Sequence, residues 1–278
     1  MNATPLQNRV VFITGAGHGV GAATARAVVD AGACVAVLDR DGASAAAVAL
    51  PLATRALALE GDVTDSQQLD RAVAATVERF GGIDAVVANA GIEILDPVGS
   101  MQPADFQRVL DVDLVGSWRT VRATLPAVTE RRGYYLMVAS LAAVAHAPLN
   151  GAYSAAKAGL VALAKTMRLE FAPHGIDVGI AYLTYTDTET GRRAVEDPRM
   201  QALFASAPRL RPKPMPVEHV AVTYVRAIID RRRRLLFDRS SAVAVHLPEV
   251  GAAIGERMLR GAIARLPSLS VQPGPFPI

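Results

Sequence analysis

The sequence predicts a single α/β domain built around a doubly wound parallel sheet, with a lid insertion and a C-terminal helical tail. Short runs rich in β-branched residues alternate with longer alanine-rich stretches from residue 9 onward. Such alternation predicts a parallel sheet with helices on both faces. A length of 278 residues fits one large domain of this kind, which we place over residues 1–278.

The pattern predicts the position of each core element. Strands are expected at residues 10–14, 34–39, 57–59, 85–89, 134–140 and 177–181. The helices between them are expected at residues 19–31, 44–50, 66–80, 103–130 and 152–171. A helix at 218–230 and a possible last strand at 234–237 complete a core of about residues 9–237.

Two segments depart from this alternation. Residues 186–217 are polar and proline-rich and too long for a simple connection, which predicts a lid or binding loop; a disordered excursion is the alternative. Residues 238–278 form a C-terminal extension. We expect its helix to pack on the body of the protein or on a neighbouring subunit rather than on a membrane surface. Its apolar residues recur at helical spacing at Val250, Ile254, Met258, Leu259, Ile263 and Leu266.

Composition and charge exclude several classes of function. The net charge of +3 is small, and much of the basic excess lies at residues 231–234, so no nucleic-acid partner is expected. Cys34 is the only cysteine, which points to a reducing compartment. The N-terminus lacks the basic-then-apolar order of a signal peptide, and no apolar run approaches the roughly twenty residues of a spanning helix. A cytoplasmic protein without membrane contact is predicted, and no metal site is identified.

A glycine-rich segment joins the first predicted strand to the first predicted helix. Gly15 permits a tight turn, Gly19 lets backbone amides approach a pyrophosphate, and Gly21 lets the helix pack closely on the strand. The helix N-terminus then presents unpaired N–H groups to the phosphates. This context predicts the dinucleotide-binding loop of a Rossmann fold, with cofactor contacts at Gly15, Gly17, His18, Gly19, Val20 and Gly21.

Asp39 ends the second predicted strand. A carboxylate there can hydrogen-bond both hydroxyls of an adenosine ribose and would repel a 2′-phosphate. Arg40 and His18 could partly offset that repulsion, but NAD is expected over NADP. Further candidate cofactor residues follow the third and fourth strands, although they could also be turn or capping residues: Asp62, Val63, Asn89, Ala90 and Gly91.

Tyr153 and Lys157 lie four residues apart on a predicted helix, so both side chains project from one face. A free tyrosine, with a pKa of about 10, is a poor acid/base at neutral pH. The positive charges of Lys157 and of an oxidised nicotinamide would favour the phenolate and bring its pKa toward the working range. Ser140, at the end of the preceding strand, can donate a hydrogen bond to a substrate oxygen.

In this order and at this spacing, the motifs resemble the short-chain dehydrogenases/reductases of the Tyr-x-x-x-Lys type. The match runs over about residues 10–188, from the glycine loop through Asp39, Asp62-Val63 and Asn89-Ala90-Gly91 to Ser140, Tyr153 and Lys157. The resemblance implies hydride transfer between a secondary alcohol or ketone and nicotinamide. Tyr153 would exchange the hydroxyl proton, Lys157 would hold the nicotinamide ribose, and Ser140 would orient the carbonyl.

Two positions depart from the family pattern. Asp113 stands where the family usually has an asparagine whose main-chain carbonyl leads through a water to the lysine. An aspartate also has that carbonyl, but its side chain cannot donate unless protonated; we keep Asp113 in the catalytic set. Leu183-Thr184 replaces the usual Pro-Gly. Thr188 remains where a hydroxyl can reach the cofactor, and Thr186 joins it as a candidate cofactor contact.

The expected substrate mouth is mostly apolar, which predicts a hydrophobic secondary alcohol or ketone as substrate. It comprises Ile94, Leu95, Leu141, His146, Pro148, Leu149, Met200, Leu203 and Phe204. His146 could instead be an ordinary loop histidine, and the apolar residues could be lid core. An NADPH-dependent ketoacyl-type reductase and a non-catalytic NAD(H)-binding sensor remain as alternatives.

Assembly is the last expectation. Family members commonly pair the long helices that carry Asp113 and Tyr153, and soluble enzymes generally associate symmetrically. A homo-oligomer, either a dimer or a tetramer, is therefore expected, with the homotetramer as the favoured form.

Overall fold

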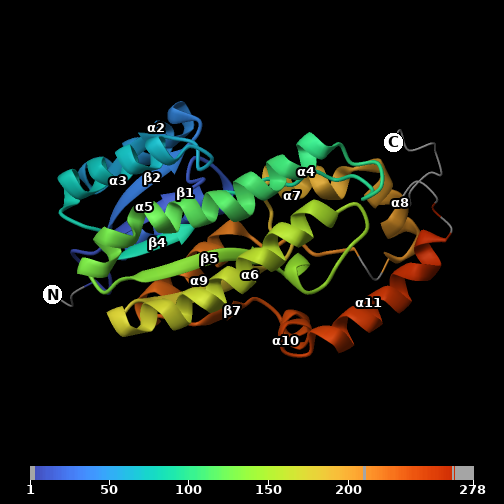
Figure 1. Ribbon diagram of the computed structural model, residues 1–278. Helices are drawn as coiled ribbons and strands as arrows, with labels where there is room; N and C mark the ends of the chain where they lie inside the picture. Colours follow the sequence, from blue (N-terminus) through green and yellow to red (C-terminus); the bar gives the residue numbers. More distant parts are fainter. Residues whose placement is uncertain (1–3, 209–210, 265, 267–278) are drawn as a thin grey trace.

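The computed structural model describes residues 4–208, 211–264 and 266. Its centre is a seven-stranded sheet in the order β3-β2-β1-β4-β5-β6-β7, and every neighbouring pair is parallel (Figure 1). The strands are β1 (Val10–Thr14), β2 (Cys34–Asp39), β3 (Ala56–Glu60), β4 (Ala85–Ala88), β5 (Tyr134–Ser140), β6 (Asp177–Leu183) and β7 (Arg234–Leu236). The predicted fold class is confirmed.

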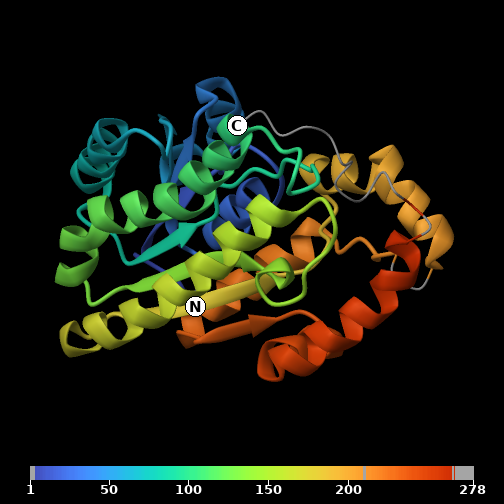
Figure 2. The ribbon, with the colours of Figure 1, turned by 45° about the vertical axis from the view of Figure 1, so that its right-hand side comes forward.

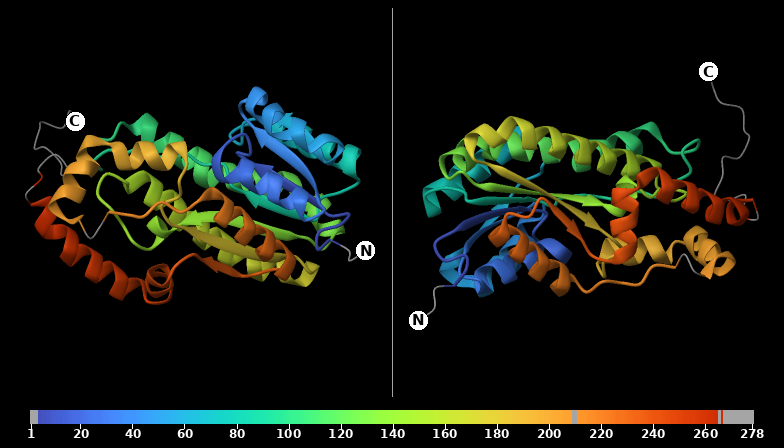
Figure 3. Two further views of the ribbon diagram at one scale, coloured as in Figure 1. Left: turned by 180° about the vertical axis from the view of Figure 1, so that it is seen from behind. Right: turned by 90° about the horizontal axis from the view of Figure 1, so that it is seen from below.

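Helices cover both faces of the sheet, as the two further views in Figure 3 show. One face carries α1 (Gly19–Asp30), α2 (Gly42–Ala49) and α9 (Val217–Asp230). The other carries α3 (Ser66–Phe80), α5 (Gly116–Glu130) and α6 (Gly151–Phe171). The strand order reverses between β1 and β4, and such a switch point leaves a crevice at the carboxyl ends of the strands.

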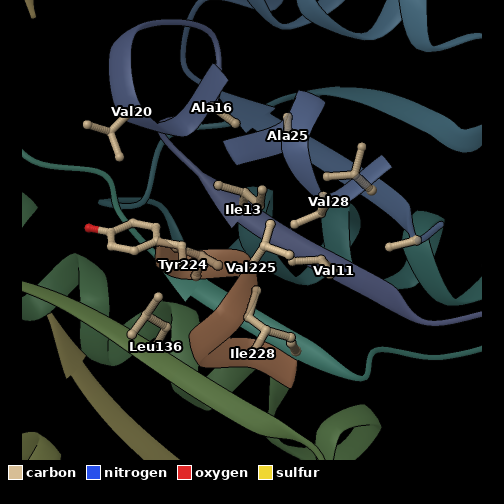
Figure 4. Close-up of a cluster of buried hydrophobic side chains, with 14 of the residues drawn as sticks. Val11, Ile13, Ala16, Val20, Ala25, Val28, Leu136, Tyr224, Val225 and Ile228 are labelled. Carbon is tan, nitrogen blue, oxygen red and sulfur yellow. The ribbon is translucent and has the colours of Figure 1, made fainter. Parts of the chain in front are cut away.

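The sequence of β1 shows why the central strands form. All five residues of this strand are buried, and successive side chains enter opposite cores because strand side chains alternate in direction. Val11 and Ile13 lie in the core beneath α9, beside its Val225 and Ile228 (Figure 4). Phe12 lies in the core on the other face. A sheet buried on both sides therefore gives a continuous apolar run.

The helix expected at residues 103–130 is interrupted. It consists of α4 (Pro103–Leu110), a single π-helical turn (Asp111–Val115) and α5. Asp113 lies in the π turn, and its side chain is completely buried. Turns of this kind occur often at functional sites.

The lid segment contains regular structure that the sequence pattern did not predict. Helices α7 (Glu189–Glu196) and α8 (Pro198–Ser206) occupy much of it, and each begins at a capping side chain. Thr188 accepts a hydrogen bond from the Gly191 amide, and Asp197 accepts one from the Arg199 amide. Helices this short show too few turns for a clear period, which is why composition alone suggested an irregular loop.

The tail forms α10 (Arg239–His246) and α11 (Pro248–Ile263), the second of which reaches α8 (Figure 2). Ala262 is buried with Leu203 and Leu149, and Leu259 and Leu266 pack around them. Packing on the body of the protein is therefore confirmed for this end of the helix, whereas Val250 is exposed. The side chains of Ile254 and Met258 and residues 267–278 lie outside the described part of the chain. None of the described helices has the length and apolar character needed to cross a membrane.

Candidate active site

A cavity of about 1640 Å³ lies at the carboxyl ends of the strands. Its walls come from the glycine loop, from the segments that follow β2 to β6, and from the lid helices α7 and α8. Small-molecule pockets usually measure about 300–1,000 Å³. The cavity therefore has room for a dinucleotide together with a substrate.

The glycine loop is shaped by close backbone contacts. A Cβ atom on Gly15, whose φ is +62°, would lie 2.8 Å from the Cα of Ala90. A Cβ atom on Gly21 would lie 2.2 Å from the carbonyl oxygen of Gly15, so only glycine lets α1 approach the loop this closely. Residues 15 and 18–20 line the cavity, whereas Gly17 and Gly21 shape the loop behind it. The glycines thus let the loop pack closely against β4 and α1, with its backbone at the cavity wall, as a bound pyrophosphate requires.

Asp39 is held in the cavity wall by two backbone amides. Its Oδ2 accepts from the Gly17 N–H at 2.8 Å, and its Oδ1 accepts from the Asp41 N–H at 3.1 Å. His18 lies nearby, with Nε2 3.1 Å from the hydroxyl of Ser44, and Arg40 lines the same wall. These contacts fix the carboxylate beside the glycine loop, where a group that accepts hydrogen bonds from the ribose hydroxyls is needed.

The residues after β3 and β4 also have structural roles. The Asn89 amide nitrogen donates to the carbonyl oxygens of Thr14 and Gly15, both at 3.0 Å, and so ties the glycine loop to the end of β4. Asp62 accepts from the Thr64 amide at 2.8 Å, which is the turn geometry expected of such a residue. All of the predicted cofactor residues here still line the cavity: Asp62, Val63, Asn89, Ala90 and Gly91.

The start of the lid lies against the glycine loop. A Cβ atom on Gly19 would lie only 3.0 Å from Cγ2 of Thr188. The hydroxyl of Thr186 donates to the Thr184 carbonyl at 3.0 Å. Thr186 and Thr188 both line the cavity, on the side that faces the glycine loop. Their contacts with a cofactor stay a prediction.

The predicted catalytic side chains meet in this cavity. Helix α6 carries Tyr153 and Lys157 on one face, and the Lys157 Nζ lies 5.4 Å from the centre of the Tyr153 ring. Lys157 also donates to the carbonyl oxygen of Val138 at 3.1 Å. Ser140, at the end of β5, is close enough to Tyr153 to lower its pKa.

Asp113 joins the site through its side chain. One carboxylate oxygen accepts from the Ile92 amide at 2.8 Å, and the other lies 3.0 Å from Nζ of Lys157. The main-chain carbonyl, through which a family asparagine would act, accepts from the hydroxyl of Ser117 at 2.9 Å. The departure from asparagine thus creates a buried ion pair next to the catalytic lysine.

This ion pair changes the electrostatics expected from the sequence. Burial raises the pKa of Tyr153 to about 12; Lys157 lowers it in part, while Glu93 and Asp113 raise it further. Burial lowers the pKa of Lys157, but Asp113, Tyr153 and Glu93 together outweigh this effect and raise it, so the ammonium persists. Lys157 therefore lowers the pKa of Tyr153, as expected, but burial outweighs it, and the added effect of a nicotinamide charge stays a prediction.

Sequence reasoning missed Glu93. This residue lines the cavity two positions beyond Gly91, and burial raises the pKa of its carboxyl. The Asn150 amide nitrogen donates to Glu93 Oε1 at 2.8 Å. An acidic residue so close to the end of a central strand was the available signal, because ligands bind at that edge of a parallel sheet.

The expected substrate mouth is only partly correct. Leu149 and Leu203 are buried in the lid core, Ile94 packs near α4 and α6, and His146 is exposed with Nδ1 3.1 Å from the Ala142 carbonyl. These four do not line the cavity, so His146 is an ordinary loop histidine here. The predicted residues that do line it are Leu95, Leu141, Pro148, Met200 and Phe204.

Comparison with known proteins identifies the family. The model of the short chain dehydrogenase family matches residues 9–199. The chain belongs to this family. This short-chain dehydrogenase is accordingly an oxidoreductase that acts on CH–OH and C=O groups, and the resemblance seen in its motifs is confirmed.

Individual relatives agree with this assignment. The chain is 34% identical over 221 residues to an uncharacterized NAD-dependent oxidoreductase of Mycobacterium tuberculosis, which covers 73% of this chain and 79% of the relative. It is 35% identical over 175 residues to galactitol 2-dehydrogenase of Agrobacterium fabrum, covering 62% and 68% of the two chains. Among solved structures, a 3-ketoacyl-(acyl-carrier-protein) reductase of Brucella melitensis complexed with NADH has a TM-score of 0.72 and 27% identity, covering 80% and 91%.

Proposed function

We propose that this short-chain dehydrogenase transfers a hydride between NAD(H) and a hydrophobic secondary alcohol or ketone. The observation that carries the proposal is the convergence of Tyr153, Lys157 and Ser140 on one cavity. That cavity also reaches the glycine loop and includes the apolar side chains Met200 and Phe204 of the lid segment, which suit a hydrophobic alcohol.

The chain's own groups account for the proton and for orientation. When bound, the nicotinamide ring accepts the hydride. Tyr153 as phenolate takes the proton of the substrate hydroxyl in oxidation, and as phenol returns it in reduction. Ser140 donates a hydrogen bond to the substrate oxygen. Lys157 supplies the positive charge that favours the phenolate, and its ammonium is held by Asp113 and the Val138 carbonyl.

The position of Asp39 favours NAD over NADP. Two backbone N–H groups already fix its carboxylate, so two ribose hydroxyls could donate to it without rearrangement, whereas a 2′-phosphate would meet a negative charge. An NADPH-dependent ketoacyl-type reductase is therefore the second choice. A non-catalytic NAD(H) sensor is third, because Ser140, Tyr153 and Lys157 are all present and line one cavity.

Location and assembly belong to the proposal as well. A cytoplasmic setting rests on the single cysteine, which suits a reducing compartment. A homo-oligomer, with a homotetramer as the expected form, rests on the family resemblance. Trp118 of α5 and Leu169 of α6 are 47% and 78% exposed, which leaves apolar surface on both of these long helices.

The cofactor assignment is tested by replacing Asp39 with alanine. Wild-type protein should bind NADH more tightly than NADPH, and Asp39→Ala should weaken NADH binding about tenfold to a hundredfold, because hydrogen bonds to a charged acceptor are lost. Calorimetric titration of both dinucleotides gives the two dissociation constants. Asp70→Ala, which removes an exposed carboxylate of α3 outside the cavity, is the matched control. A wild-type preference for NADPH would contradict the assignment.

A further inference from the structure

Glu93 is a half-buried acid in the wall of the catalytic cavity that the proposed hydride transfer does not use. Its Oε1 accepts from Asn150, but Oε2 has no hydrogen-bond partner within the described residues. Burial raises the pKa of this carboxyl. A cavity-lining carboxylate oxygen with no partner among the described residues can accept a hydrogen bond from a bound ligand.

The neighbouring charges do not supply that partner. The carboxylate of Asp113 already contacts both Lys157 and the Ile92 amide. Lys157 is further bonded to the Val138 carbonyl. The nearby acid Asp96 differs from Glu93, because it pairs with Arg199 outside the cavity. Among the described residues near β4, Glu93 is thus the acid whose free oxygen belongs to the cavity.

Asn150 adds a second acceptor at the same place. Its side-chain oxygen is buried and has no hydrogen-bond partner in the described part of the chain, while its nitrogen is used by Glu93. Glu93 Oε2 and Asn150 Oδ1 are both acceptors without a protein donor among the described residues, so this place suits a ligand that supplies a hydrogen-bond donor.

This acceptor pair lies next to the reacting group. Asn150 immediately precedes α6, and Tyr153 follows three residues later, a spacing that puts the two side chains on one side of the helix start. The carboxylate of Glu93 is also near enough to raise the pKa of Tyr153. A donor bound by Glu93 therefore shares the cavity wall that Tyr153 and Asn150 also line.

We propose that Glu93 accepts a hydrogen bond from a second hydroxyl of the substrate, so that this enzyme prefers vicinal diols and the matching hydroxy ketones with an apolar remainder. The inference rests on the proposed function and refines its substrate class. In oxidation, one carbinol carbon loses a hydride to the nicotinamide and its hydroxyl proton to Tyr153, giving a ketone. The adjacent hydroxyl stays unchanged, and Glu93 exchanges no proton in the net reaction.

The test compares hexane-2,3-diol with hexan-2-ol and hexan-3-ol, which share one carbon skeleton. Wild-type enzyme should show kcat/KM for the diol at least about tenfold above either mono-alcohol, since a hydrogen bond to a charged acceptor is gained. Glu93→Gln, which keeps the size but exchanges the free oxygen for an amide donor, should lower this ratio about tenfold, and Glu93→Met at least as far. Any effect on catalysis common to the substrates cancels in the ratio. Asp96→Asn is the matched control and should keep the wild-type ratio.

Several results would overturn the proposal. Equal kcat/KM values for the diol and the mono-alcohols in wild type would do so, as would a diol preference that survives in both Glu93 variants. A stronger preference for 3-aminohexan-2-ol would show that the carboxylate selects a cation instead of a hydroxyl. If no alcohol is oxidised at all, the proposed function fails. The calorimetric dissociation constants of the diol and the mono-alcohol then test whether Glu93 binds a second hydroxyl. Equal affinity of wild-type protein for hexane-2,3-diol and hexan-2-ol would in that case contradict its role.

Discussion

At the scale of single residues, Asp113 most distinguishes this site from the family pattern. An asparagine would leave the charge of Lys157 free to act on Tyr153. Here a buried carboxylate lies 3.0 Å from that ammonium. Burial raises the pKa of Tyr153 to about 12, and the charge of Asp113 adds to that rise. The positive charge of an oxidised nicotinamide would lower this pKa toward moderate pH.

Replacing Asp113 with asparagine should move the pH profile of alcohol oxidation toward acid. Oxidation needs the phenolate, so kcat/KM rises as pH increases toward the pKa of Tyr153. Removing the opposing negative charge lowers that pKa, and the rising limb should move by about one pH unit. Initial rates between pH 6 and 11 measure the shift, after thermal unfolding has shown that the variant is folded.

Asp111→Asn provides the matched control for this experiment. Asp111 lies in the same π turn but pairs with Arg119 at 2.7 Å and does not line the cavity. Its replacement should leave the rising limb in place. An unchanged or alkaline-shifted profile in Asp113→Asn would contradict the electrostatic role given to the Asp113–Lys157 pair.

At the scale of elements, the tail helix α11 supports the lid. Ala262, Leu259 and Leu266 pack against Leu203 of α8, the helix that also presents Met200 and Phe204 to the cavity. The C-terminal extension thus contacts the substrate end of the site through one intervening helix. Small apolar contacts of this kind hold a lid in place without joining the chemistry.

Placing a charge in this contact should weaken substrate binding. Ala262 is 1% exposed, and Ala262→Glu would force a carboxylate into the apolar cluster, so that α11 separates from α8. KM for the alcohol should rise roughly three- to tenfold, with the exchange of α8 amide hydrogens accelerated. Ala253→Glu, on the exposed face of the same helix, is the control. Unchanged KM and unchanged exchange in Ala262→Glu would show that the tail does not support the lid.

At the scale of the whole molecule, the sequence predicted the sheet and the place of the glycine loop in the fold, while the cofactor contacts stay a prediction. Central strands buried on both faces must be apolar runs, and the glycine loop must follow β1, so both are local signals. The π turn was not predictable, because Asp113 is held there by Ile92 and Lys157 from other elements. Glu93 was missed for the same reason, since its partner Asn150 lies 57 residues away in the chain. Assembly into a homo-oligomer stays a prediction.

The central claim is that Tyr153 carries the proton in a hydride transfer to NAD, and one assay tests it most directly. Absorbance at 340 nm follows NADH formation with NAD or NADP and a panel of hydrophobic secondary alcohols and diols. Wild-type enzyme should reduce NAD in preference to NADP. Tyr153→Phe should lose activity by at least about a hundredfold, as expected for a general acid/base, while still binding NADH. Equal turnover by Tyr153→Phe, or tight NADH binding with no turnover of any panel member by wild type, would contradict the account.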